Sequence, residues 1–206
     1  EYPGDPGPPG GDCAGVLSVV GVEASHLRVG GGAFGFASGC LASIARAPAG
    51  LLTAMPLALG FDEACTLPIV WSTTHVAFAG AQLVASQRVL VHAAAGGVGL
   101  VACAYASWLG TRVEVTAGQP YKHSILLETR SNAASSRSAA AFTTGMTKQL
   151  NQRRVHMTLN ALSADFIAMS VALQGERSYF EEIGKRAAWA VPRARASASH
   201  STPHTL

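Results

Sequence analysis

The segment from Val89 to Gly99 places the strongest constraint on what this chain can fold into. It begins with Val89-Leu90-Val91, an apolar run that indicates a buried strand, and passes through closely spaced glycines into a helical pattern. Within it, Ala94-x-Gly96-x-x-Gly99 fits the dinucleotide-binding fingerprint, with alanine at the first glycine position. Gly96 lets the backbone approach a pyrophosphate, Gly99 lets the helix pack against the strand, and the free amides of the helix start receive the phosphate charge. A plain glycine turn between packed elements is the structural alternative.

The rest of the second half alternates between strand and helix patterns. Expected strands cover residues 112–116, 155–160 and 179–183, and expected helices cover 122–130, 139–152 and 164–173. Such alternation predicts a parallel sheet with helical crossovers. Earlier in the chain, β-rich segments at 14–20, 33–37 and 41–47 are separated by glycine turns, and a helix interrupted at Pro68 is expected to about residue 82.

We therefore expect an α/β chain: a Rossmann-type parallel sheet, incomplete, preceded by part of a β-rich domain. The expected divisions are residues 1–60 for the β-rich part, 61–186 for the dinucleotide-binding domain, and 187–206 for a disordered or non-native tail.

Composition and charge exclude several classes of protein. Charged residues make up 13% of the 206 residues and hydrophobic residues 49%, which argues against disorder. Residues 1–87 carry two basic and six acidic side chains, and residues 88–206 carry thirteen and six. The basic half favours anionic partners, but its basic side chains are too sparse for a nucleic-acid surface. The charge-free stretches 64–87 and 89–111 are interrupted by Pro68 and by His92 with the glycines, so we expect no membrane span.

The four cysteines give no sign of a metal site or a disulfide framework. Cys13, Cys40, Cys65 and Cys103 are far apart in sequence and form no C-x-x-C pair. The first dozen residues are rich in proline and glycine and do not resemble a secretory signal. We expect no bound metal, free thiols in a reducing compartment and a cytoplasmic location.

The end of the expected strand at 112–116 bears on the choice between NAD and NADP. A carboxylate there would bind the ribose diol of NAD, but Val115–Pro120 contains none. Lys122 follows, and Ser136 and Arg137 come at the end of the next expected strand. Basic and hydroxyl side chains without a carboxylate suit a 2′-phosphate, so NADPH is the expected cofactor. Surface solvation is the alternative role for Lys122 and Arg137.

Five motifs stand in the order and spacing of one family. They are Gly11-Asp12-Cys13-Ala14-Gly15-Val16, residues 64–73 (Ala64-Cys65-Thr66-Leu67-Pro68 onward), residues 91–99, Leu159-Asn160-Ala161-Leu162-Ser163 and Glu182-Ile183-Gly184-Lys185-Arg186. Together they resemble the enoyl-reductase domain of modular polyketide and fatty acid synthases. That family belongs to the zinc-independent branch of the medium-chain dehydrogenase/reductase superfamily, near the quinone oxidoreductases, and its first domain is GroES-like.

The resemblance implies NADPH-dependent reduction of a 2,3-enoyl thioester carried on an acyl carrier protein, alongside the other domains of a synthase. Hydride passes to the β-carbon and a proton to the α-carbon. The implied cofactor-binding residues are Ala95, Gly96, Gly97, Val98 and Gly99 at the pyrophosphate, Thr73 near the cofactor, Thr116, Lys122, Ser136 and Arg137 at the adenosine phosphate end, and Asn160 and Leu162 at the nicotinamide side. Lys122 also matches a lysine proposed in the family as proton donor, which makes it the catalytic candidate.

The sequence departs from the family pattern at several positions, and one of these departures affects the expected activity. The tyrosine often proposed as the acid lies upstream of Tyr2, and the residues after 186 do not match the later strands, so we expect little turnover from this polypeptide alone. Ala141 replaces a frequent aspartate, Gly31-Gly32 a usual Asp-Arg, and Arg177-Ser178 a usual glycine pair. Two other functions stay open: a free-standing zinc-independent quinone or enone reductase, and a non-catalytic remnant or truncated fragment. His92 is expected to be a packed or hydrogen-bonded histidine and not a catalyst.

Overall fold

The computed structural model describes residues 7–128, 133–184 and 201–205 of the chain. The chain divides into two compact units, Glu1–Ser72 and Thr73–Leu206, and each is described by itself.

The first unit is built on a three-stranded antiparallel sheet. Its strands follow in the order β1 (Asp12–Val16), β2 (Gly32–Phe36) and β3 (Leu52–Ala54), with a 3-10 turn at Ala49–Leu51 and helix α1 at Phe61–Ala64. A small core forms under the loop between β1 and β2, where Ala24, Leu27 and Ala33 are buried. The glycine-rich, short-stranded sequence of this part therefore folds as a β-rich unit, which extends to Ser72 where the sequence predicts a boundary at residue 60.

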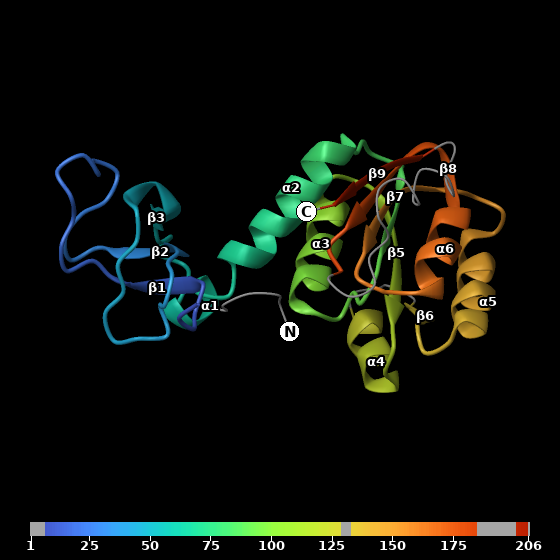
Figure 1. The fold of residues 1–206 in the computed structure, drawn as a ribbon, viewed down its shortest axis with the longest axis horizontal. Coiled ribbons are helices and arrows are strands. Elements are labelled where there is room, and N and C mark those ends of the chain that lie inside the picture. The colour runs from blue at the N-terminus through green and yellow to red at the C-terminus, as the bar shows by residue number, and fades with distance from the viewer. Residues whose placement is uncertain (1–6, 129–132, 185–200, 206) are drawn as a thin grey trace. The chain divides into compact units, whose positions relative to one another are not determined.

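The second unit contains a six-stranded parallel sheet in the order β6-β5-β4-β7-β8-β9 (Figure 1). The strands are β4 (Arg88–Val91), β5 (Arg112–Ala117), β6 (Ala133–Ser135), β7 (Val155–Asn160), β8 (Gln174–Glu182) and β9 (Ser201–Thr205). The chain begins this sheet at β4 in the middle, moves outward through β5 and β6, and then returns to β7 on the other side of β4. Open α/β sheets bind ligands at such a reversal, beyond the carboxyl ends of the strands.

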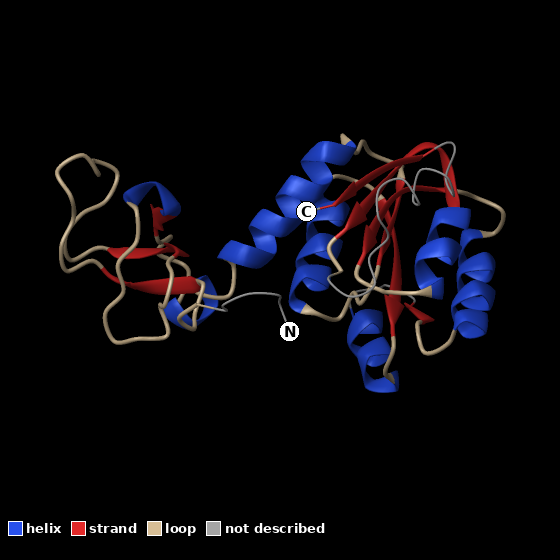
Figure 2. Ribbon diagram, in the orientation of Figure 1, coloured by secondary structure: helices blue, strands red, loops and turns tan. Residues whose placement is uncertain are grey.

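Helices cover both faces of this sheet, as Figures 1 and 2 show. They are α2 (Pro68–Ala81), α3 (Gly97–Trp108), α4 (Pro120–Glu128), α5 (Ala139–Leu150) and α6 (Asp165–Ala172). Val89 and Val91 of β4 share a core with α2, α3 and α4, whereas Leu90 packs with α5 and α6. Strand β4 is buried on both faces, which explains its continuous apolar run.

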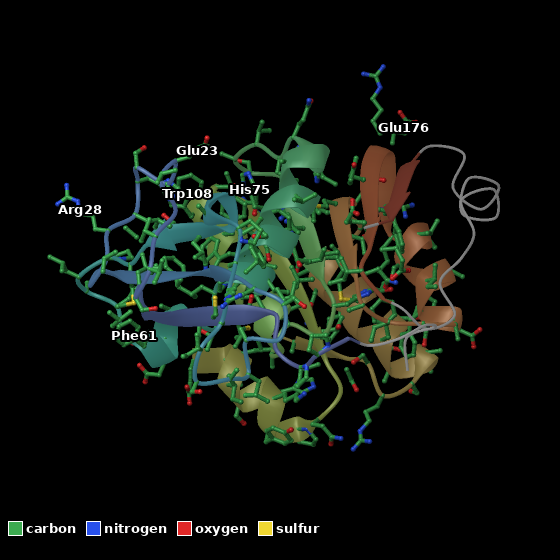
Figure 3. The ribbon with its side chains drawn as sticks, turned by 60° about the vertical axis from the view of Figure 1, so that its left-hand side comes forward. Glu23, Arg28, Phe61, His75, Trp108 and Glu176 are labelled. Carbon is green, nitrogen blue, oxygen red and sulfur yellow. The ribbon has the colours of Figure 1, made fainter. Side chains whose placement is uncertain are left out.

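A stack of aromatic rings joins α2 to α3. Phe78 lies over Tyr105 with ring centroids 5.5 Å apart, and Tyr105 lies over Trp108 at the same separation. Nδ1 of His75 on α2 lies 3.1 Å from the Tyr105 hydroxyl. Figure 3 labels His75 and Trp108 on these helices.

Most of the expected elements form, and two segments differ from expectation. Residues 41–47, expected as a strand, form an irregular loop in which Leu41 and Ile44 are 79% exposed, because no neighbouring strand pairs with them. Residues 201–205 of the expected tail form β9, which pairs with the edge of β8 through backbone hydrogen bonds that need no apolar pattern. The rest of that tail, residues 187–200 and 206, lies outside the described residues, as do 129–130 of the expected helix at 122–130. Among the residues that the structure describes, no helix combines the length and the apolar character needed to cross a bilayer.

Candidate functional site

The turn between β4 and α3 lies at the carboxyl end of the central strand. Helix α3 begins at Gly97 with Gly96 as its N-cap, and Gly96 has no side chain that could cap the helix. The amides of the first helical turn therefore lack partners within the helix, as at any helix start. Gly97 is exposed and Gly96 and Val98 are half-buried, so a ligand can approach this end of the helix. The helix dipole adds a positive potential at the same place.

Gly99 sets how closely the helix approaches the turn. A Cβ atom added at Gly99 would lie 2.6 Å from the carbonyl oxygen of Ala93 and 2.6 Å from Cα of Ala94, which are both backbone atoms. Only glycine fits there. At Gly96 the same test gives 3.3 Å to the Ala93 oxygen, a tight contact that a small shift relieves. The spacing of these two glycines thus follows from the packing of the turn.

Two hydrogen bonds to the neighbouring strand β5 hold the turn in shape. Thr116 is fully buried, its hydroxyl accepts from the amide of Ala93 at 3.2 Å, and its carbonyl accepts from the amide of Ala94 at 3.0 Å. Ala93 has a positive φ of 49°, so these bonds stabilise a backbone conformation that alanine rarely adopts. The sequence places Thr116 among the cofactor-binding residues; in the structure its hydroxyl is engaged by the turn, so any effect on a ligand passes through the turn's backbone.

The residues expected at the adenosine phosphate end come together beyond β5 and β6. The guanidinium Nη2 of Arg137 donates to Oε1 of Gln119 at 2.9 Å, and the amide of Lys122, in the first turn of α4, donates to the carbonyl of Gln119 at 3.0 Å. The amide of Ser136 donates to the carbonyl of Ala117 at 3.1 Å. Arg137 is exposed, and Lys122 and Ser136 are half-buried. These three residues, which we call the Lys122 cluster, thus lie in the segments that follow two adjacent strands.

The one acidic residue of β5 is engaged elsewhere. Glu114 forms an ion pair with Arg88, the first residue of β4. In the register of β4 and β5, Arg88 pairs with Arg112, so this ion pair lies toward the amino end of the two strands. The Glu114 carboxylate is therefore not at the carboxyl end of β5, where a ribose diol would be bound.

The carboxyl end of β7 carries Asn160, whose side chain is fully buried. Its Nδ2 donates to the carbonyl of Leu162 at 2.7 Å and to Oε2 of Glu182 at 2.6 Å. Its Oδ1 lies 2.6 Å from Nδ1 of His92 and accepts from the amide of Leu162 at 3.4 Å. Both ends of the Asn160 amide are thus engaged within the protein.

His92 is buried directly after β4, as expected for a packed, hydrogen-bonded histidine. Its Nε2 lies 3.1 Å from the hydroxyl of Ser170 on α6, and its ring meets Phe142 of α5 edge-on. Burial lowers the pKa of His92 to about 4, against a smaller opposing effect of the hydrogen bond to Asn160. The imidazole is therefore uncharged at neutral pH.

The other expected site residues are placed as follows. Ala95 lies half-buried in the turn before α3, and Leu162 lies half-buried just after β7. Thr73 is half-buried on α2, and within the described residues its side chain makes no hydrogen bond to the turn. Sequence analysis did not assign Ser170 or Glu182 to the site, because their partners are 78 and 22 residues away in the chain and no local pattern links them.

Comparison with known proteins identifies homologous segments in large synthases. No protein-family model matches the chain. It is 33% identical over 182 residues to a highly reducing polyketide synthase of Gibberella zeae and 36% identical over 180 residues to erythronolide synthase of Saccharopolyspora erythraea. These alignments cover 86% and 85% of this chain but only 8% and 5% of the two synthases.

Solved structures give the same family. The CurK enoyl reductase superposes with a TM-score of 0.87 at 29% identity, over 95% of this chain and 59% of that one. Escherichia coli quinone oxidoreductase complexed with NADPH superposes with a TM-score of 0.85 over 100% of this chain and 65% of that one; at 21% identity this likeness shows the fold alone. Over most of its length the chain is thus homologous to segments of polyketide synthases, and its fold matches that of an enoyl reductase of the medium-chain dehydrogenase/reductase superfamily.

Proposed function

We propose that this chain is the NADPH-binding part of an enoyl reductase that reduces the 2,3 double bond of an enoyl thioester. The thioester is carried on an acyl carrier protein within a polyketide or fatty acid synthase. The observation that carries the proposal is the start of α3: amides without helical partners at an N-cap glycine, next to the point where the strand order reverses. The family of the chain supports the reaction class.

The pyrophosphate is proposed to rest on the amides of residues 95–99. A phosphate bridge carries negative charge, and the exposed start of α3 offers both N–H donors and the positive end of the helix dipole. Gly99 keeps the helix close to the turn, and Thr116 fixes the turn's backbone. This chain therefore offers an anion site whose donors already stand together at the start of α3.

NADPH is preferred over NADH in this proposal because of the cluster beyond β5 and β6. Arg137 and Lys122 provide positive charge and Ser136 provides a hydroxyl, all suited to a 2′-phosphate. The carboxylate of Glu114 is held by Arg88 and cannot accept from a ribose diol. NADPH-complexed structures with this fold support the choice.

The chemistry divides between cofactor and protein. When bound, a reduced nicotinamide supplies a hydride to the β-carbon of the enoyl thioester, and the α-carbon takes up a proton. The residues of this chain hold and orient the dinucleotide: the turn before α3 at the phosphates, the Lys122 cluster at the adenosine end, and Asn160 with Leu162 at the nicotinamide end. Lys122 is also the candidate proton donor, and the two roles are separable by experiment.

The test is a titration of the 206-residue chain with NADPH and NADH, followed by calorimetry. We expect NADPH to bind about tenfold or more tightly than NADH, a difference of ~1.4 kcal/mol. Gly96→Asp should weaken both by about tenfold or more, because a carboxylate would face the phosphates at the helix start. Ala104→Asp, which adds the same charge at an exposed position in the middle of α3, is the matched control.

Each result bears on a different part of the proposal. A folded chain that binds neither nucleotide would overturn it and favour a non-catalytic remnant. Equal affinity for NADH and NADPH would overturn the cofactor preference alone. In the parent enzyme, reduction of a quinone in place of an enoyl thioester would favour the free-standing quinone reductase, whose fold this chain shares.

A further inference from the structure

Four buried polar side chains form a continuous hydrogen-bonded network at the carboxyl ends of three strands. They are His92 after β4, Asn160 at the end of β7, Glu182 at the end of β8 and Ser170 on α6, each 4% exposed or less. We call this set the strand-end network. Successive links measure 3.1 Å from Ser170 to His92, 2.6 Å from His92 to Asn160 and 2.6 Å from Asn160 to Glu182.

The partners fix where the hydrogens lie in the network. Nδ2 of Asn160 donates to two acceptors, Leu162 O and Glu182 Oε2, so Oδ1 is the atom that faces His92. Nδ1 of the imidazole must then carry the hydrogen, and Nε2 of the neutral ring is an acceptor. The Ser170 hydroxyl has a single hydrogen, which it shares between that nitrogen at 3.1 Å and the Phe166 carbonyl at 2.7 Å. The network therefore selects one tautomer of His92 and one orientation of the Asn160 amide.

The network also holds the backbone that follows two strands. After β7, both the amide and the carbonyl of Leu162 bond to the Asn160 side chain. After β8, Oε1 of Glu182 accepts from the amide of Gly184 at 2.7 Å, and the carbonyl of Asn160 accepts from the amide of Ile183 at 3.0 Å. The two strand ends are thus tied together through Asn160.

We propose that His92 and Glu182 are positioning residues for the nicotinamide half of the bound dinucleotide. The inference rests on the proposed function, which places that half at the end of β7. His92 and Glu182 fix the Asn160 amide, and Asn160 in turn fixes the backbone around Leu162, which is the surface that a ligand meets. Because His92 and Ser170 are 2% exposed or less, neither touches a substrate, so their pairing is not a catalytic dyad.

The test separates the two halves of the cofactor. NADPH reports on both halves, and adenosine 2′,5′-bisphosphate reports on the adenosine end alone. We expect His92→Leu to weaken NADPH binding about tenfold and to leave adenosine 2′,5′-bisphosphate binding within about twofold, because the loss of one buried hydrogen-bonded link loosens only the β7 end. His92→Gln, whose amide nitrogen can donate to Asn160 Oδ1, should recover most of the NADPH affinity.

Two further variants complete the design. Thr158→Val removes a buried hydroxyl from the same strand but outside the network, and should change neither affinity. Glu182→Gln is nearly isosteric and serves if His92→Leu fails to fold by circular dichroism. Its side-chain amide would set a donor against Nδ2 of Asn160 or against the amide of Gly184, so it should also weaken NADPH selectively.

The outcomes distinguish this inference from the proposed function. Selective loss of NADPH affinity with recovery in His92→Gln supports it. Equal weakening of both ligands in His92→Leu, or no weakening, overturns it while the proposed function stands. Failure of the wild-type chain to bind either ligand overturns the proposed function and this inference with it.

Discussion

Lys122 is a residue with two proposed roles, as a ligand of the 2′-phosphate and as a proton donor. Its position in the first turn of α4, where its amide donates to the carbonyl of Gln119 and the side chain of Gln119 accepts from Arg137, favours the first. We expect Lys122→Met to weaken NADPH binding about tenfold and to leave NADH binding unchanged, because only NADPH carries the phosphate. Lys122→Arg should keep the NADPH affinity. The measurement is a pair of calorimetric titrations for each variant.

A second readout tests the proton-donor role. An arginine side chain stays protonated and cannot supply a proton. If Lys122→Arg in the parent synthase binds NADPH normally but loses enoyl reduction, Lys122 is the donor. Unchanged reduction would leave it with phosphate binding alone.

At the same scale, sequence patterns predict some site residues better than others. The spacing of Gly96 and Gly99 is local, and the clash that a Cβ at Gly99 would create explains why glycine is required there. The buried, hydrogen-bonded state of His92 is also predictable from its place after an apolar strand. The hydrogen bond between Asn160 and Glu182 cannot be predicted in this way, because 22 residues separate them and only the strand order brings them together.

Strand β8 contains a backbone irregularity near Arg177. Arg177 has a positive φ of 57°, and the register between β7 and β8 shifts between Val155 and Met157. Glycine adopts such a conformation without strain, whereas a residue with a Cβ atom does not. The bulge therefore contains a residue whose side chain is poorly suited to its backbone conformation.

We expect Arg177→Gly to raise the free energy of unfolding by about 1 kcal/mol, since a left-handed conformation costs a residue with a Cβ roughly that much. Glu176→Gly is the matched control. Glu176 is also exposed on β8, has no positive φ and projects from the ribbon in Figure 3, so glycine there should destabilise by roughly 0.5–1 kcal/mol. Urea unfolding measures both. Destabilisation by Arg177→Gly would show that the Arg177 side chain contributes contacts that outweigh the strain.

Elements buried on both faces are the ones that sequence predicts most easily. Strand β4 is a continuous apolar run because helices cover both of its sides. The segment 41–47 has a similar apolar content but no neighbouring strand, so its pattern misleads. Apolar patterns do not predict strand β9. It is an edge strand that contains Pro203, and it forms through backbone pairing with β8 and not because of its own composition.

In the second unit, burial shifts the pKa values of His92 and Glu181 in opposite directions, so the two groups make stability depend on pH in opposite ways. Burial lowers the pKa of His92 to about 4, so the unfolded chain binds more protons and stability falls as the pH drops from about 6.5 to 4. Burial, with the nearby Glu182 carboxylate, raises the pKa of Glu181 to about 7, so the folded chain binds more protons and stability falls as the pH rises from 4.5 to about 7. Burial raises the pKa of Glu182 as well, which acts in the same direction.

Glu181→Gln separates the two effects. At pH 8 the variant no longer has to keep a buried carboxylate charged, so its melting temperature should exceed that of the wild type. At pH 4.5, where Glu181 is protonated in the folded wild type, the two should melt close together. Glu176→Gln, at an exposed position of the same strand, should show no such difference between the two pH values. An equal shift at both pH values would mean that Glu181 acts through packing and not through its charge.

Helix α3 joins the proposed phosphate site to the aromatic stack. Its first residue, Gly97, lies at the exposed turn, and Trp108, stacked on Tyr105, ends the same rigid helix. Indole emission overlaps the absorption of a dihydronicotinamide, so occupancy of the turn should dim the intrinsic fluorescence of the molecule. We therefore expect a fluorescence titration with NADPH to report binding without an attached dye.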